Sequence, residues 1–196
     1  MKRIPLIVFA AIAAIQLAVP IYLIADREYV IQNGKVYHLR TEPVDPYDAF
    51  RGRYVYLKYE FEGKLKEDLE KRYLPTGNPE GRSKKKIYVT FKRNSDGFAS
   101  IEEISEAIPS TSYYIAIPIV LKDYDESISL TVPFNRFYMD EFKAPEAESA
   151  YQEESGRKNA YAVVRVKNGR AVITDLMIDG TPIRKYLLKR IRSKKR

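Results

Sequence analysis

The chain offers few residues for nucleophilic catalysis. His38 is the only histidine, and there is no cysteine. A histidine general base would therefore have to be His38, and a thiolate nucleophile is excluded. His38 lies in a segment that we predict to be a β-strand, where a single histidine is more often structural. The first serine, Ser83, comes far beyond the apolar N-terminus, which argues against a serine and lysine pair next to a membrane. We therefore assign no catalytic residue.

The acidic residues form no recognisable site either. A metal site would have to be built from carboxylates, and neither a calcium-loop spacing nor a phosphate-cradling glycine loop occurs. Asp45 and Asp48 are explained as turn residues, and the acidic run between Glu146 and Glu154 as a solvated helix face. The sequence thus predicts no metal and no cofactor. Two carboxylates that converge in space, as in glycoside hydrolysis, remain an open alternative.

Basic residues are concentrated at the C-terminus of a chain whose formal net charge is +8. The residues that we expect to contact an anionic surface are Arg184, Lys185, Lys189, Arg190 and Arg192. Such a segment can bind anionic lipid headgroups or an acidic partner, and a solvated, frayed terminus is the alternative. Because the rest of the chain is balanced in charge and a membrane segment precedes it, we predict no binding to nucleic acid.

An uncharged, apolar run extends from Ile4 to Ala25, directly after Lys2 and Arg3. As a helix it would be roughly 33 Å long, enough to cross the hydrocarbon core of a bilayer. Cleavage as a signal peptide is the competing interpretation, but the small-x-small triplet that starts at Ala11 comes too early. Residues 1–25 are therefore predicted to be a retained transmembrane anchor.

The position of Lys2 and Arg3 favours an N-terminus in the cytoplasm, because long domains are exported largely regardless of their charge. Arg27 and other basic residues also follow the span, so this bias is modest. We predict a single-pass protein of the cytoplasmic membrane with its domain outside, in the periplasm or the extracellular space. Gln16 within the span could form a hydrogen bond to a partner helix, or could have no particular partner.

Residues 26–181 are predicted to form one mainly β (α+β) domain. Asn33-Gly34, Asp96-Gly97 and Asn168-Gly169 each separate strand-like runs, as expected for β-hairpin turns. The first of these would join residues 29–32 to residues 35–39. Further strands are expected at residues 54–61, 113–121 and 127–132. The expected architecture is an antiparallel sheet or open barrel with several hairpins.

Helices are expected to be short and peripheral. Leu65, Leu69 and Tyr73 have helical spacing, and a second, mostly acidic helix is predicted from Pro145 to Glu154. Residues 75–86, which are rich in proline, glycine and lysine, should form a mobile loop. Residues 182–196 are predicted to be a basic amphipathic tail, with Thr181 as its cap and Pro182 in the first helical position.

The segment from Pro43 to Tyr59 resembles the bacterial family named after its GDYXXLXY motif. The residues that carry the resemblance are Asp45, Pro46, Arg51, Gly52, Tyr54, Leu57 and Tyr59, followed downstream by Arg136, Tyr138 and Glu141. Arg53 stands where the motif has aspartate. The resemblance extends over nearly the whole chain and implies a membrane-anchored protein, often encoded beside multi-pass membrane proteins. It implies no biochemical activity.

Within the motif, strand alternation should place Tyr54 and Tyr56 on one face, and Leu57 and Tyr59 on the other. The motif would then specify sheet packing or present a tyrosine-rich surface to a partner. We predict a non-enzymatic accessory protein of the bacterial envelope, bound to the bilayer through residues 4–25 and partnering multi-pass membrane proteins. An envelope hydrolase, or a binder of cell-wall or lipid components, is the alternative.

Overall fold

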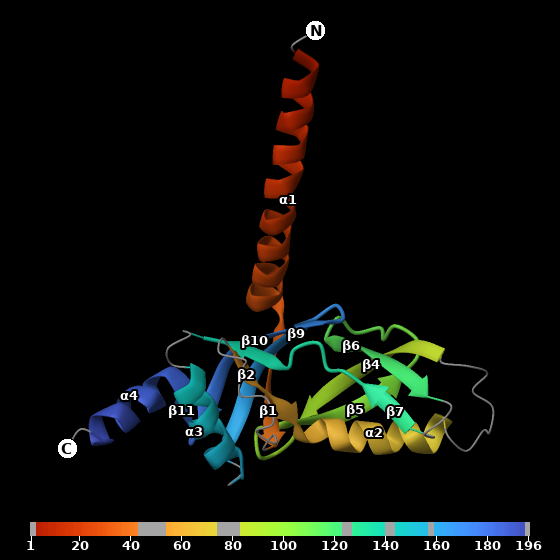
Figure 1. Cartoon of the computed structure of the whole chain (residues 1–196). Coiled ribbons are helices and arrows are strands. Elements are labelled where there is room, and N and C mark those ends of the chain that lie inside the picture. Colours follow the sequence, from red (N-terminus) through yellow and green to blue (C-terminus); the bar gives the residue numbers. More distant parts are fainter. Residues whose placement is uncertain are drawn as a thin grey trace.

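A computed structural model describes residues 3–42, 54–73, 83–122, 127–139, 144–156 and 159–194. Its first element, helix α1 (Arg3–Asn33), projects as a single rod from a β-rich domain (Figure 1). The apolar side chains between Ile7 and Ala25 do not pack on the domain; Phe9 and Ile24, for example, are 69% and 68% exposed. The stretch Ile7–Asn33 is long and apolar enough to cross a membrane.

The helix continues two turns beyond the apolar run. The predicted strand at residues 29–32 and its hairpin at Asn33-Gly34 are therefore wrong, because these residues complete α1. The Gly34 amide donates to the Val30 carbonyl (2.8 Å), and the Asn33 side-chain amide donates to the Tyr29 carbonyl (3.0 Å). An Asn-Gly pair suits a helix C-terminus as well as a hairpin. The Asn-Gly pair alone does not distinguish a helix C-terminus from a hairpin turn.

The larger sheet lies under the base of α1 and has the strand order β11-β10-β9-β1-β3. Its strands are β1 (Lys35–Glu42), β3 (Lys58–Tyr59), β9 (Ala160–Lys167), β10 (Arg170–Ile178) and β11 (Thr181–Pro182). The predicted hairpin at Asn168-Gly169 is confirmed. Both turn residues have positive φ (50° and 80°), as a two-residue turn between twisted strands requires.

A second sheet has the order β5-β4-β6-β7. It consists of β4 (Ser83–Arg93), β5 (Ala99–Ser105), β6 (Tyr114–Lys122) and β7 (Ser127–Leu130), and the predicted hairpin at Asp96-Gly97 is confirmed. The tip of the β9–β10 hairpin docks on β6: the Gly169 carbonyl accepts from the Ala116 amide (3.0 Å). The predicted class of antiparallel sheets with hairpins is thus confirmed, including a half-barrel.

The two predicted internal helices exist, and each buries one face against the core. Helix α2 (Glu60–Tyr73) buries Phe61, Leu65 and Leu69, and helix α3 (Ala144–Gly156) buries Ala147, Ala150 and Tyr151 in the same core. The expected solvated face of α3 is wrong at Glu154, which is only 6% exposed. Its carboxylate accepts from the Asn159 amide and the Tyr186 hydroxyl, both at 3.3 Å. The positions of α2 and α3 are decided by the apolar side chains that they bury, rather than by the overall composition of the helices.

The basic C-terminal segment is helix α4 (Ile183–Lys194), as predicted, but it starts one residue later than expected because Pro182 belongs to β11. Ile183 and Leu187 are completely buried in the core, so the first turns of α4 are fixed to the domain. Arg190 pairs with Glu153 of α3 at 3.0 Å. Of the predicted mobile loop, residues 75–82 lie outside the described part, and Lys84 to Lys86 belong to β4.

Candidate functional site

The motif strand alternates as predicted. Tyr54 and Tyr56, in strand β2 (Tyr54–Tyr56), are half-buried, whereas Leu57 and Tyr59 on the opposite face are completely buried. Strand β2 pairs antiparallel with β8 (Arg136–Tyr138), with Tyr54 opposite Tyr138. The other residues predicted for the motif, namely Asp45, Pro46, Arg51, Gly52, Arg53 and Glu141, lie outside the described residues.

The buried residues of the motif hold the segment that leads into β8. The Tyr59 hydroxyl donates to the Phe134 carbonyl (2.8 Å), and the Leu57 amide donates to the Asn135 carbonyl (2.8 Å). The Tyr59 ring also lies against the Phe134 ring, with centroids 5.2 Å apart. Burial raises the pKa of Tyr59 well above its usual value, so its hydroxyl remains a donor throughout the physiological range.

The other residues of the motif bring together side chains that are far apart in sequence. Tyr54 and Tyr138 meet edge to face, with ring centroids 5.6 Å apart. The Arg136 guanidinium lies 5.0 Å from the centre of the Tyr54 ring, within the range of a cation–π contact. Tyr138 is 56% exposed. The predicted site residues Tyr54, Arg136 and Tyr138 therefore form one surface cluster.

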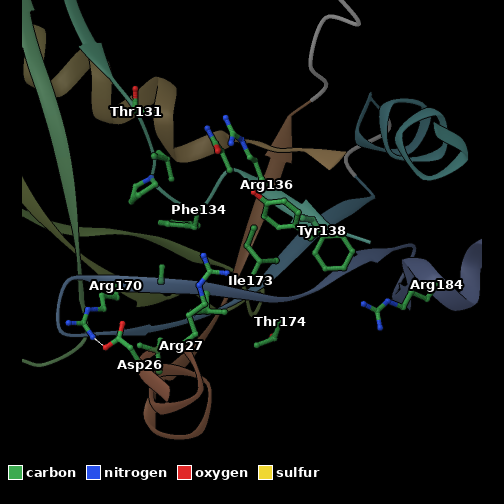
Figure 2. Close-up of a pocket in the computed structure, with 17 residues that line it drawn as sticks. Asp26, Arg27, Thr131, Phe134, Arg136, Tyr138, Arg170, Ile173, Thr174 and Arg184 are labelled. Carbon is green, nitrogen blue, oxygen red and sulfur yellow. Dashed lines mark hydrogen bonds and ion pairs between the residues drawn. The ribbon is translucent and has the colours of Figure 1, made fainter. Parts of the chain in front are cut away.

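Beside this cluster lies a cavity of about 640 Å³, which we call the helix-base cavity (Figure 2). Its lining includes Asp26, Arg27 and Val30 of α1 and residues 131–138, the segment held by the motif. In Figure 2, Asp26 and Arg27 lie on one side, and Phe134 and Arg136 lie on the opposite side. Residues 170–174 of β10 lie between them, and Arg184 of α4 lies at one end. Figure 2 shows Arg27 extending from α1 past Ile173 in the direction of Arg136.

The cavity lining is rich in positively charged side chains. Among the described residues, the lining contains four arginines, Arg27, Arg136, Arg170 and Arg184, and one carboxylate, that of Asp26. Asp26 forms an ion pair with Arg170. Within the described residues, no carboxylate lies in ion-pair range of the other three arginines. A single, paired carboxylate does not supply the two acidic groups of a glycosidase, whereas several arginines suit the binding of an anion.

The remaining predicted site residues lie elsewhere. Lys185 and Lys189 are exposed on α4, Arg190 is in its ion pair with Glu153, and the side chain of Arg192 lies outside the described residues. His38 is in β1, where its ring lies 5.3 Å from that of Tyr161, and burial, assisted by Arg93, lowers its pKa. Among the described residues, no cluster of three potential ligands could hold a metal.

Sequence reasoning missed Arg27 and Arg170 as site residues. Arg27 was considered only as a charge after the span, and Arg170, which directly follows the predicted Asn168-Gly169 turn, was not considered. The only sequence signal was their position next to those two features, and neither feature indicates that α1 and β10 meet.

Helix α1 is held against β9 and β10 without a linker. Gly34 alone separates α1 from β1, and Val30 is 1% exposed. Lys167 donates to the Asn33 carbonyl and Arg165 to the Gly34 carbonyl, both at 3.4 Å. Together with the Asp26–Arg170 pair, these contacts fix the direction of the helix relative to the sheet.

These features define a class of protein: a β-rich domain joined rigidly to an exposed apolar helix that can anchor it in a membrane. The chain matches the GDYXXLXY protein family over residues 16–176 and belongs to that family. The predicted family is thereby confirmed. Comparison with curated proteins and with solved structures gave no match.

Proposed function

We propose that this chain is a non-enzymatic accessory protein of the bacterial cell envelope, held in the cytoplasmic membrane by α1 and partnering integral membrane proteins. The observation that carries the proposal is that α1 is apolar and exposed between Ile7 and Ala25, where Phe9, Ile15 and Ile24, for example, are 69%, 65% and 68% exposed. Such a surface requires a lipid or protein environment.

The junction between helix and domain supports a role in assembly. A flexible tether would leave the domain free to rotate, whereas the one-residue link and the contacts of Val30 and Asp26 hold it at a fixed angle. A partner helix that packs on α1 would therefore also fix the position of the domain. Gln16 is exposed in the middle of the span, where a polar side chain can form a hydrogen bond to a neighbouring helix.

Photocrosslinking tests this proposal. With a photoreactive amino acid in place of Gln16, we expect the full chain in native membranes to crosslink to an integral membrane protein, identified by mass spectrometry after detergent extraction. The matched control carries the same amino acid at Ala18, which lies about 200° around the helix, on the opposite face. Protein adducts are expected at the first position and lipid adducts at the second. Lipid adducts alone at both positions would rule out a helical partner at Gln16.

We also propose that the domain lies outside the cytoplasm, which Lys2 and Arg3 ahead of the span support. Because the chain has no cysteine, a single Ile108→Cys substitution gives a clean test. Ile108 is 66% exposed. We expect a membrane-impermeant maleimide to label this variant in intact spheroplasts, while a cysteine added at the N-terminus is labelled only after lysis. The reverse pattern would place the domain in the cytoplasm.

The cavity gives specific support to one alternative, a protein that binds an anionic envelope component. It gives none to a hydrolase that uses paired carboxylates, because Asp26 is the one acidic residue in the described part of the lining. Binding and partnering are compatible roles, since the cavity and the middle of α1 are separate surfaces.

A further inference from the structure

We infer that the helix-base cavity binds the phosphate of an anionic phospholipid headgroup, in the leaflet from which the domain projects. The inference rests on the proposed insertion of α1 into a bilayer and adds a ligand to that function.

The depth of the cavity is the first argument. The apolar run ends at Ala25, and the α1 residues of the lining, Asp26, Arg27 and Val30, follow at once. Val30 is five residues beyond Ala25, about 7.5 Å further along the helix axis. The headgroup region of each leaflet is roughly 5–8 Å thick. With the apolar run in the hydrocarbon core, the cavity lies at the level of the lipid phosphates.

The charge of the cavity is the second argument. Arg27 and Arg136 come from opposite walls, and Figure 2 shows Arg27 extending toward the segment that carries Arg136. Neither has a carboxylate partner among the described residues. A guanidinium binds phosphate through two parallel hydrogen bonds and is less strongly hydrated than an ammonium group. Two such groups in the lining of one cavity suit a phosphate better than a carboxylate or a neutral headgroup.

The motif places the second of these arginines. Tyr59 and Leu57 hold residues 134 and 135 by hydrogen bonds, and Arg136 follows directly. The Tyr54 ring then lies 5.0 Å from the Arg136 guanidinium. This contact orients the side chain without neutralising its charge. The motif thus acts as a positioning element for one wall of the site.

The surroundings favour a lipid over a soluble anion. The cavity is lined by apolar as well as basic side chains, including Val30 and Ile173, and α1 contributes to its lining. Above it along the helix, Leu23 and Ile24 are 56% and 68% exposed. A lipid with its phosphate in the cavity can lay its acyl chains against this surface, which a soluble phosphate compound would leave uncovered.

The test compares lipids by native mass spectrometry of the full chain released from detergent micelles. Phosphatidylglycerol and phosphatidylcholine with identical acyl chains are added at equal concentration. We expect phosphatidylglycerol to bind about tenfold or more tightly, and the double variant Arg27→Gln/Arg136→Gln to lose about tenfold or more of that affinity. The matched control, Lys185→Gln/Lys189→Gln on α4, removes the same charge and is expected to stay within about twofold of the unmodified protein.

Three outcomes would overturn the inference: equal binding of the two lipids, undiminished binding by the Arg27→Gln/Arg136→Gln variant, or a loss in the α4 control as large as in that variant. Glycerophosphoglycerol, the headgroup without acyl chains, is the competitor; displacement of the lipid by it at equal concentration would reassign the cavity to a soluble phosphate. Flotation with pure phosphatidylcholine vesicles reports on the anchor separately. We expect all variants to float, and a chain that does not float would refute the proposed anchoring itself.

Discussion

Replacing Tyr59 with alanine is expected to lower the free energy of unfolding of the domain by about 3–5 kcal/mol. Tyr59 is completely buried, stacks on Phe61, contacts the tilted Phe134 ring, and donates a hydrogen bond to the Phe134 carbonyl. The substitution removes the ring from the core and leaves that carbonyl unpaired. Because the chain has no tryptophan, urea unfolding of the full chain in detergent micelles can be followed by tyrosine fluorescence and circular dichroism.

Two further variants separate the causes of this loss. Tyr59→Phe keeps the ring and removes the hydroxyl, so it should cost about 1–3 kcal/mol, the penalty for an unsatisfied buried carbonyl. Tyr138→Ala removes a motif tyrosine that is 56% exposed, and its cost should stay below about 1 kcal/mol. A Tyr138→Ala effect as large as that of Tyr59→Ala would contradict the division of the motif into a buried and an exposed face.

Replacing Gly34 with alanine should destabilise the helix–domain junction by about 1–3 kcal/mol. A β-carbon at this position would lie 2.5 Å from the Val30 carbonyl oxygen and 3.1 Å from both the Arg165 β-carbon and the Val166 amide nitrogen. Two of these neighbours are backbone atoms, so relief requires the end of α1 to move away from β9. We expect a lower free energy of unfolding, together with a broader distance distribution between spin labels at Val19→Cys and Ile108→Cys.

Gly63→Ala is the matched control. Gly63 lies within α2, and a β-carbon there would meet no atom within 4 Å. Alanine is the better helix former, so this variant should gain about 0.5–1 kcal/mol. If Gly34→Ala is as well tolerated as Gly63→Ala and leaves the label distances unchanged, the junction is not the rigid connection that we describe.

The β-structure was largely predictable because its signals are local. Strand alternation and the turn residues at Asp96-Gly97 and Asn168-Gly169 act over a few neighbouring residues, and both hairpins formed as expected. The Asn33-Gly34 pair failed as a signal because it fits two structures. Because the preceding residues are already helical, the pair marks the end of a helix, whereas a preceding strand would have made it a hairpin turn.

The burial of the helices was not predictable in the same way. The acidic composition of α3 indicated a solvated position, yet Tyr151 and Glu154 are buried, because the domain covers them with elements distant in the chain. Periodicity shows that a helix has an apolar side. It does not show how much of the opposite side other elements will cover.

By itself, the sequence determined the apolar helix, the antiparallel hairpins, the alternating motif strand and the basic character of the C-terminus, since each depends on neighbouring residues. Only the tertiary structure decided that Arg27 and Arg136 share one cavity at the base of α1. They are brought together by the docking of α1 on β10 and by the hydrogen bonds from the motif to residues 134 and 135. Such long-range contacts depend on how complete surfaces pack, which no local pattern of residue types encodes.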